Sequence, residues 1–572
     1  MERSARDVIL AEKEDELTKQ SLDIIEICRA SQGQRAAAYR SYGQWCETGR
    51  AAGGLALANM LQAHLQRLAS HLFSPPELRF SIDFEYHYGK QMLDKAAMVA
   101  RATTREWERK NIDLVFGRGV YEALKYGCSI MKNLSKENGG KHDVAARLVQ
   151  PWQFAVYNEG INELSDQEAV VETAFLNEHE VWRRVQHLPD AHKLFERIKG
   201  GANKEAAVAI PTSFMHQVLS TAVLDVSLQN ATRPQPGGIV QLSNDPNFAI
   251  LGPTVGVQLY PMHELWVRDD KRKDDWTTIQ IIEPDILVAP RLKRCNLYAT
   301  DTLPYGRIQP NEVTDYFWGR SEIVDLQMLQ QWLTTHMEDI QRITGQEADR
   351  LFAFPGYDGM TDNLYSQFRS QGYVGLPPGA TAQDLTPKLP PEFIPLIKTI
   401  LELMDRVSGF ANILSGTGEP GVRAGVHAET LMKTASPHLR DRALLIERQC
   451  AERGDATLAA QEAKDGRVYW VNEESGEEGE FLLADLPDDR RIVVDSHSTS
   501  PIYQDDHQNL LFAGIKAGFI TGESAIEQMP YQHKDILLAR LREKERQQQA
   551  LLAGLTPEER TKVLTHTGRG RH

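Results

Sequence analysis

Residues Gly416 to Gly421, with the sequence GTGEPG, match the spacing GxGxxG that binds the pyrophosphate of a dinucleotide in some enzymes. In that motif, backbone N–H groups at the start of a helix contact the phosphates, and a strand comes immediately before them. Here the preceding residues, up to Leu414, have the apolar pattern of a helix, and Pro420 lacks an N–H donor. We therefore interpret the segment as a break between two helices, with a nucleotide-binding enzyme as the alternative.

Other patterns that support catalysis or metal binding are incomplete. The sequence has no GxxxxGK[ST] phosphate loop, no HExxH zinc helix and no GxSxG serine elbow. His64 and His71 lie seven residues apart, which is more typical of a helix face than of two metal ligands. Adjacent residues such as Asp505, Asp506 and His507 point in different directions on a helix. We therefore predict no catalytic residue, no cofactor and no metal, and we do not expect an enzyme.

The cysteines and the charge restrict the class of protein further. The five cysteines are widely scattered and form no CxxC pair, so we expect neither a disulfide framework nor a thiolate zinc site. The net charge is −15, from 64 basic and 79 acidic residues, whereas a protein that grips DNA through its phosphates normally has a basic face. The charge leaves two interpretations open: the protein does not meet nucleic acid, or it meets DNA without holding it tightly.

Helical patterns dominate the elements that would position these residues. The most regular helix is expected over 319–343, where apolar residues recur at helical spacing and three of them lie seven apart. Its apolar residues are Ile323, Leu326, Leu329, Leu333, Met337, Ile340 and Ile343. Further helices are expected over 5–31, 57–72, 92–133, 392–415 and 424–463. The charged N-terminus has no apolar signal-peptide core, and no run of eighteen apolar residues occurs, so we expect a protein made and kept in a cytoplasm or in a particle assembled there.

Strand patterns occur in several parts of the chain. They are expected at 78–86, in two stretches of 145–176, over 257–300 with a charged turn from Asp269 to Asp275, and in short pieces up to 495. Residues 228–256 and 375–391 are rich in Pro and Gly, which predicts loops. The fold class is therefore α+β, predominantly α-helical.

Several segments, in order along the chain, resemble segments of tailed-bacteriophage portal proteins. They are YGQWCETG and ANMLQAHLQRLASHLFSP within 42–75, WERKNIDLVFGRGVYEALKYGCSIMK, VQPWQFAVYNE, HELWVRDDKRKDDW, YFWGRSEIVDLQMLQQWL, SGFANILSGTGEPGVRAGVHAETLMKTASPHLRDRALLIER and VDSHSTSPIYQDD. Their common order from about residue 39 to 545 makes the resemblance specific, except at 200–256, where we expect an insertion.

The resemblance implies a portal-protein fold with a wing, stem helices, a β-rich clip and a helical crown, assembled as a ring of usually about twelve subunits. Carried onto this chain, the N-terminal wing takes 1–176, the first stem helix and insertion 177–256, the clip 257–318, the second stem helix 319–343, the C-terminal wing 344–500, and the crown and tail 501–572. Within the C-terminal wing, 375–391 is the expected channel loop and 392–415 the expected long helix.

The channel loop supplies the candidate DNA-facing residues. Lys388 is its only basic residue, and we predict that Lys388, Gln383 and Thr386 approach DNA. The resemblance also implies the function: a ring-shaped DNA channel at one capsid vertex, used for genome packaging, head-tail joining and genome ejection. The implied partners are other copies of the chain, the major capsid protein, scaffolding protein, the terminase motor, head-tail adaptors and double-stranded DNA, without a membrane. A ring-forming virion adaptor without a packaging role is a further alternative.

Overall fold

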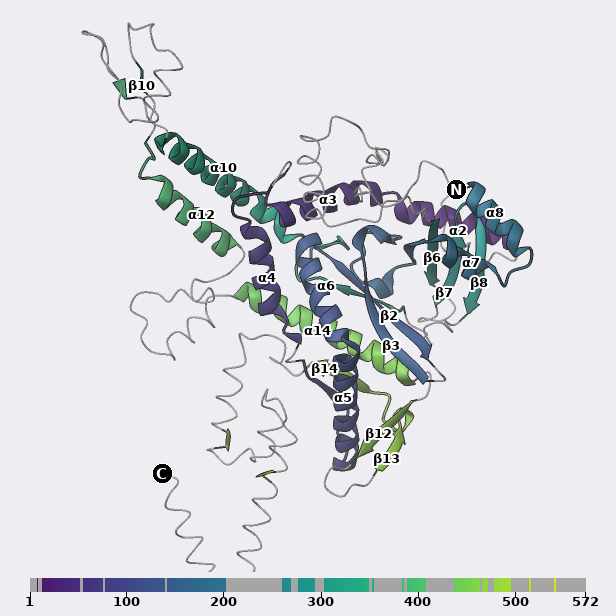
Figure 1. Ribbon diagram of the computed structural model, residues 1–572. Helices are drawn as coiled ribbons and strands as arrows, with labels where there is room; N and C mark the ends of the chain where they lie inside the picture. The colour runs from purple at the N-terminus through teal and green to yellow at the C-terminus, as the bar shows by residue number, and fades with distance from the viewer. Residues whose placement is uncertain are drawn as a thin grey trace, which may run out of the picture.

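The computed structural model has mixed α and β structure in which helix predominates, as the sequence predicts (Figure 1). It describes residues 8, 13–51, 55–75, 78–138, 141–201, 260–268, 276–293, 303–348, 352–353, 383–384, 388–407, 437–462, 466–471, 478–494, 514–515 and 540–541. In this part of the chain, no helix combines the length and the apolar content that a bilayer-spanning helix requires.

The main helices of the described residues flank the sheets, and two of them extend away from the sheets (Figure 1). They are α2 (Glu14–Arg29), α3 (Gln32–Thr48), α4 (Met60–Leu72), α5 (Lys90–Lys110), α6 (Ile112–Tyr126), α7 (Glu178–Val185), α8 (Ala191–Gly201), α10 (Glu322–Ala348), α12 (Phe393–Val407) and α14 (Pro437–Glu462). The helix expected over 319–343 is therefore confirmed as α10, and the described part of the helix expected over 392–415 is α12.

Helix α4 illustrates how the local sequence sets these bounds. The side chain of Asn59 accepts a hydrogen bond of 3.4 Å from the backbone N–H of Gln62, which caps the first turn. The leucines at spacings of three and four are fully buried: Leu61, Leu65, Leu68 and Leu72. Leu57, expected as the first leucine of this helix, lies before the cap and is 52% exposed.

Two sheets hold most of the strands. The five-stranded antiparallel sheet has the order β4 (Phe154–Val156), β5 (Ala169–Leu176), β6 (Tyr260–Arg268), β7 (Trp276–Ile282) and β8 (Ile286–Lys293). The three-stranded sheet has the order β3 (Lys141–Val149), β2 (Ser129–Asn138) and β9 (Tyr305–Ile308). The remaining pairs are β1 (Phe80–Phe84) with β14 (Arg490–Val494), β10 (Phe352–Ala353) with β11 (Gln383–Asp384), and β12 (Arg467–Val471) with β13 (Glu478–Leu482).

The helical pattern predicted over 92–133 is confirmed up to Tyr126, apart from a break at Asn111, and is wrong after it. Asn111 has a φ of 55° and separates α5 from α6, while Gly127 has a φ of 94° and ends α6. At Gly127, a Cβ would lie 2.8 Å from the Trp318 carbonyl oxygen, so the turn requires glycine. After it the chain becomes β2, and Ile130 lies in that strand rather than in a helix.

The strands also join segments that the sequence placed in different regions. Strand β6 pairs with β5 from Val267 opposite Ala169 to Tyr260 opposite Leu176, and β9 pairs with β2. Strands β6 to β8 therefore extend the sheet that contains β4 and β5, and β9 extends the sheet that contains β2 and β3. Of the range 177–256, expected to hold the first stem helix and an insertion, the structure describes residues 177–201. They contain two short helices, α7 and α8, with Asp190 at a φ of 58° between them.

Candidate functional site

The predicted DNA-facing residues lie near the far end of a helix pair. Lys388 is exposed in the segment before α12, and Gln383 lies in β11, opposite Ala353 of β10. Thr386 and the segment 416–421 lie outside the described residues, as do Asp505, Asp506 and His507. Lys388 and Gln383 therefore both lie close to the end of α12 that is farthest from the sheets. No contact between their side chains is described.

Helices α10 and α12 run side by side and extend away from the sheets, with β10 beyond the far end of α10 (Figure 1). The chain goes outward along α10 and returns along α12, so the two helices are antiparallel. The ring of His336 on α10 meets the ring of Phe393 on α12 edge-on, with 5.7 Å between their centroids. We call α10, α12 and the β10–β11 ladder the arm.

Polar contacts attach one side of the arm to the segment around α4. The Gln330 side chain on α10 donates to the Ala58 carbonyl oxygen at 2.8 Å and accepts from the Met60 N–H at 3.0 Å. On α12, the Asp405 carboxylate accepts a hydrogen bond of 2.7 Å from the Arg67 guanidinium of α4. Gln330 and Asp405 therefore define the inner side of the arm.

The opposite side of the arm exposes large apolar side chains. Met328 and Trp332 each lie two residues from Gln330 and are 60% and 51% exposed. Two residues along an α-helix correspond to a rotation of about 200°, so both side chains point away from α4. By the same geometry Leu403 and Val407, which flank Asp405, also point away from it, and they are 37% and 49% exposed.

Leu396 belongs to the same apolar stripe, because it lies seven residues before Leu403 and is 40% exposed. We call Met328, Trp332, Leu396, Leu403 and Val407 the outer face of the arm. Helix α12 is amphipathic: its apolar half buries Ile400 and Met404 and leaves the neighbouring Leu403 and Val407 exposed. Exposed apolar side chains that lie close together on a surface often mark a site of protein association.

The sequence predicted a helix over 392–415 without indicating which of its apolar residues are exposed. The apolar positions of α12 form a single face about half the helix wide, and periodicity does not say which part of that face is covered. Trp332 was not among the apolar residues named for the helix over 319–343, so this part of the outer face was not predicted.

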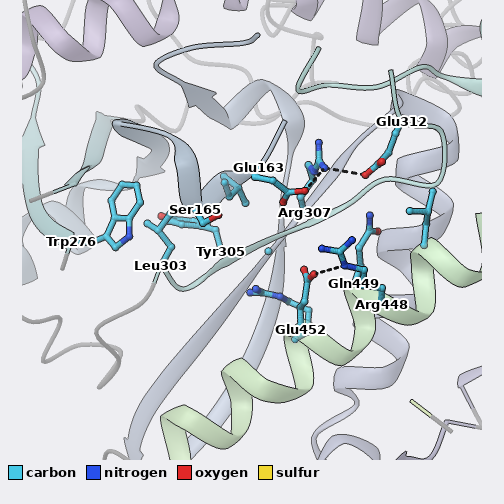
Figure 2. A pocket seen from close by; sticks show the side chains of 14 residues that line it. Glu163, Ser165, Trp276, Leu303, Tyr305, Arg307, Glu312, Arg448, Gln449 and Glu452 are labelled. Carbon is cyan, nitrogen blue, oxygen red and sulfur yellow. Dashed lines mark hydrogen bonds and ion pairs between the residues drawn. The ribbon is translucent and has the colours of Figure 1, made fainter. Parts of the chain in front are cut away.

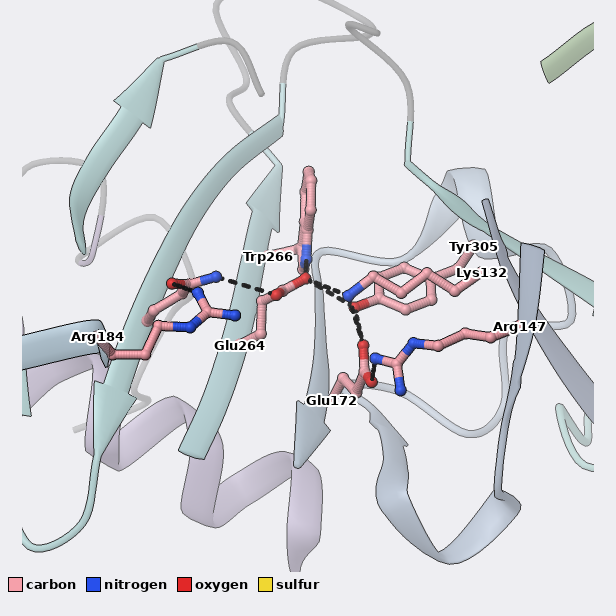
Figure 3. A network of polar contacts seen from close by, with 8 residues as sticks. Lys132, Arg147, Glu172, Arg184, Glu264, Trp266 and Tyr305 are labelled. Carbon is pink, nitrogen blue, oxygen red and sulfur yellow. Dashed lines mark hydrogen bonds and ion pairs between the residues drawn. The ribbon is translucent and has the colours of Figure 1, made fainter. Parts of the chain in front are cut away.

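A buried charged network joins the two sheets (Figure 3). The Lys132 ammonium on β2 donates to Glu172 on β5 at 2.6 Å and to Glu264 on β6 at 2.7 Å. The Tyr305 hydroxyl on β9 lies 2.7 Å from Glu172 and 3.0 Å from Glu264, and its one proton is shared between these two carboxylates. The indole N–H of Trp266 adds a bond of 2.9 Å to Glu264.

This network has the residue types of an acid–base site but no access to a substrate. The side chains of Lys132 and Glu172 are only 1% and 3% exposed. Burial alone raises the pKa of Glu264, but the adjacent Lys132 charge and the hydrogen bonds from Lys132, Trp266 and Tyr305 outweigh it, so the pKa lies below its usual value. The arrangement therefore acts as a polar clamp between the sheets.

A cavity of about 470 Å³ lies between β9, the turn of 3₁₀ helix at Leu164–Asp166, and α14 (Figure 2). Its lining is mostly polar and charged at the α14 side, where Gln449, Arg448 and Glu452 contribute side chains. A volume of this size is within the range of small-molecule sites.

The structure shows no metal centre within its described residues, where no three His, Cys, Asp or Glu side chains are grouped closely enough to hold an ion. Cys28, Cys46, Cys128 and Cys450 are buried free thiols, and Cys295 lies outside the described residues. His64 and His71 lie on α4, and burial lowers the pKa of both imidazoles.

Comparison with known proteins adds no relative to this geometry. No family model matches the chain. No curated protein matches it either. The function must therefore be argued from the sequence and the geometry above.

Proposed function

We propose that the chain is the subunit of a phage portal, a ring at one capsid vertex through which DNA is packaged, the tail is joined and the genome leaves. The observation that carries this proposal is the outer face of the arm, a set of exposed apolar side chains on two neighbouring helices. Self-assembly covers such a face, and the ordered sequence resemblance to portal proteins supports a ring as the product of that assembly.

The proposed interface is heterologous, meaning that the outer face of one copy packs on a different surface of the next copy. Interfaces of this kind repeat head to tail and close into a ring when the rotation between copies permits it. Each copy would then contribute its arm to the wall around the central channel. The net charge of −15 suits a conduit, because a channel without a dense basic lining lets a duplex slide.

The partners of this proposal follow from its place in the particle. They are other copies of the chain, the major capsid protein, scaffolding protein, the terminase motor, head-tail adaptors and the DNA that passes through. The ring would assemble in the host cytoplasm and remain in the virion at the portal vertex. The motor would supply the energy, in keeping with the lack of a phosphate-loop motif in this sequence.

Genome packaging in the host that produces the particle tests the proposal. The variant Trp332→Glu places a charge in the outer face, and the control Leu93→Glu changes a leucine on α5 with the same 51% exposure. We expect heads made with Trp332→Glu to lack DNA, whereas heads made with Leu93→Glu are filled. Filled heads that lack tails would instead favour a virion adaptor, and full infectivity of Trp332→Glu would contradict both interpretations.

A further inference from the structure

The cavity beside α14 has a rigid wall. The Gln449 side chain, which is buried, accepts a hydrogen bond of 2.9 Å from the N–H of Gln309 and donates one of 3.3 Å to the Gln309 carbonyl oxygen. These two bonds join α14 to the residue that follows β9. The two elements that border the cavity, α14 and β9, are therefore held at a fixed distance from each other.

Among the charged side chains that the structure describes in the cavity lining, some form ion pairs and one does not. Arg307 contacts two carboxylates, with 3.1 Å to Glu312 and 3.9 Å to Glu163. Arg448 lies 3.3 Å from Glu452, which is one turn further along α14. These pairs account for all the acidic side chains and all but one of the basic side chains in the lining.

The remaining cation is Arg453. Among the described residues no carboxylate forms an ion pair with it, and its Nη1 atom is buried without a hydrogen-bond partner. Burial lowers its pKa to about 10, so the guanidinium still carries its charge at neutral pH. The nearby carboxylates of Glu452 and Asp455 stabilise this charge without a hydrogen bond to it among the described residues. An anion that binds the guanidinium directly would lower the cost of burying it.

Gly306 of β9 creates the space for this arginine. A Cβ atom at position 306 would overlap the Arg453 guanidinium, which lies across the strand at that point. The glycine therefore allows Arg453 to lie against the strand while its buried Nη1 keeps an unused donor.

Away from the charged side chains, the cavity has an apolar wall. Trp276 and Leu303 line it at the end opposite Glu312 (Figure 2). The ring of Tyr305 lines it as well, while its hydroxyl belongs to the buried network. A flat apolar group fits against such a wall, in the way that most small-molecule sites combine apolar contact with a few polar groups.

We propose that this cavity binds a small molecule that joins an oxyanion, either phosphate or carboxylate, to a flat apolar group. Arg453 would hold the oxyanion, since the planar guanidinium matches phosphate and carboxylate oxygens with two parallel hydrogen bonds. The apolar group would lie against Trp276 and Leu303. This inference does not depend on the ring, because every group in it belongs to one copy of the chain.

Calorimetric titration of the full chain tests the site with phenyl phosphate, benzoate, inorganic phosphate and benzyl alcohol. We expect saturable binding of phenyl phosphate or benzoate, and the tighter of the two identifies the oxyanion. Inorganic phosphate should bind more weakly because it lacks the apolar group, and benzyl alcohol should not bind because it lacks the charge.

Two variants connect that binding to the residues. Arg453→Met should weaken binding by about tenfold or more. Gly306→Ala should also weaken it, because the added methyl group displaces the guanidinium, and this variant decides the question if Arg453→Met does not fold. Arg101→Met, at an exposed position of α5 outside the cavity, should bind as the wild type does. Absence of saturable binding of every probe, or equal binding by Arg453→Met and Arg101→Met, would overturn the proposal.

Discussion

Asp405 on α12 accepts a hydrogen bond of 2.7 Å from Arg67 on α4, which joins residues that are 338 positions apart in the chain. The contact ties the arm to the helices beside the sheets, and it determines which side of α12 faces inward. The position of Trp332 and Leu403 on the outer face depends on this attachment and on the Gln330 contacts of α10.

Replacing Asp405 with Asn should loosen the attachment of the arm. Both side chains are partly exposed, so we expect a loss of about 1 kcal/mol in the free energy of unfolding. The control is Asp339→Asn, which removes an exposed pair with Arg342 within α10 and should cost less than Asp405→Asn. Urea titration of the three proteins measures the difference, and equal losses in the two variants would contradict a role for Asp405 in holding the arm.

Removing the Lys132 charge should destabilise the two sheets strongly. In Lys132→Met, the buried carboxylates of Glu172 and Glu264 lose the cation between them, which costs about 3 to 5 kcal/mol for a broken buried pair. Arg147→Met removes a guanidinium that also contacts Glu172 but is 44% exposed, and it should cost much less. Chemical denaturation would reveal the ranking. Similar losses for both variants would show that the clamp does not depend on Lys132.

His64 should make the protein less stable as the pH falls. Burial, with the nearby charges of Arg67 and Arg442, lowers the pKa of His64 from 6.5 to about 4 in the folded chain. Between these two pH values the unfolded chain binds a proton that the folded chain does not bind. The free energy of unfolding therefore decreases as the pH falls from 6.5 to 4, by about 3 kcal/mol for this group.

The variant His64→Gln tests this pH dependence, because it removes the titrating group and keeps an acceptor for Arg67. We expect its free energy of unfolding to fall less than that of the wild type between pH 7 and pH 4.5. His187→Gln, at an exposed position, should behave as the wild type does. If His64→Gln and the wild type lose stability equally over this range, the proposed proton uptake by His64 is wrong.

The sequence predicted individual helices and strands better than it predicted which of them pack or pair with one another. The strands around the charged turn were expected, and Arg268 of β6 does pair with Trp276 of β7. Pairing of β5 with β6 could not be read from local patterns, because the two strands are separated by a long stretch of chain. Lys132 was also beyond prediction, since a lysine is usually exposed and only the folded sheets bring Glu172 and Glu264 to it.

The sequence predicted the two helices that carry the candidate interface, but it did not predict which of their apolar residues are exposed. The periodicity of α10 identified the buried Leu326 and Leu333. Periodicity alone does not say how much of the apolar face of α12 is buried, because the buried part depends on which helices pack beside it. The exposure of Leu403 and Val407 emerges only once α10 and α4 occupy the other side.

Charges in the outer face should prevent association of the copies. Trp332→Glu and Leu403→Glu each place a carboxylate in the apolar surface, which opposes its burial in an interface. We expect either variant to be a folded monomer at concentrations at which the wild type is assembled. Leu93→Glu should assemble normally, and sedimentation velocity would separate the species. Assembly of all three variants to the same extent would exclude the outer face as the contact.

Negative-stain electron microscopy of the purified protein, combined with its native mass, tests the central claim most directly. The account predicts closed rings of identical copies with a central opening wide enough for a DNA duplex, and it predicts that these rings are absent from Trp332→Glu. Single compact molecules at every concentration, in wild type and variant alike, would contradict it.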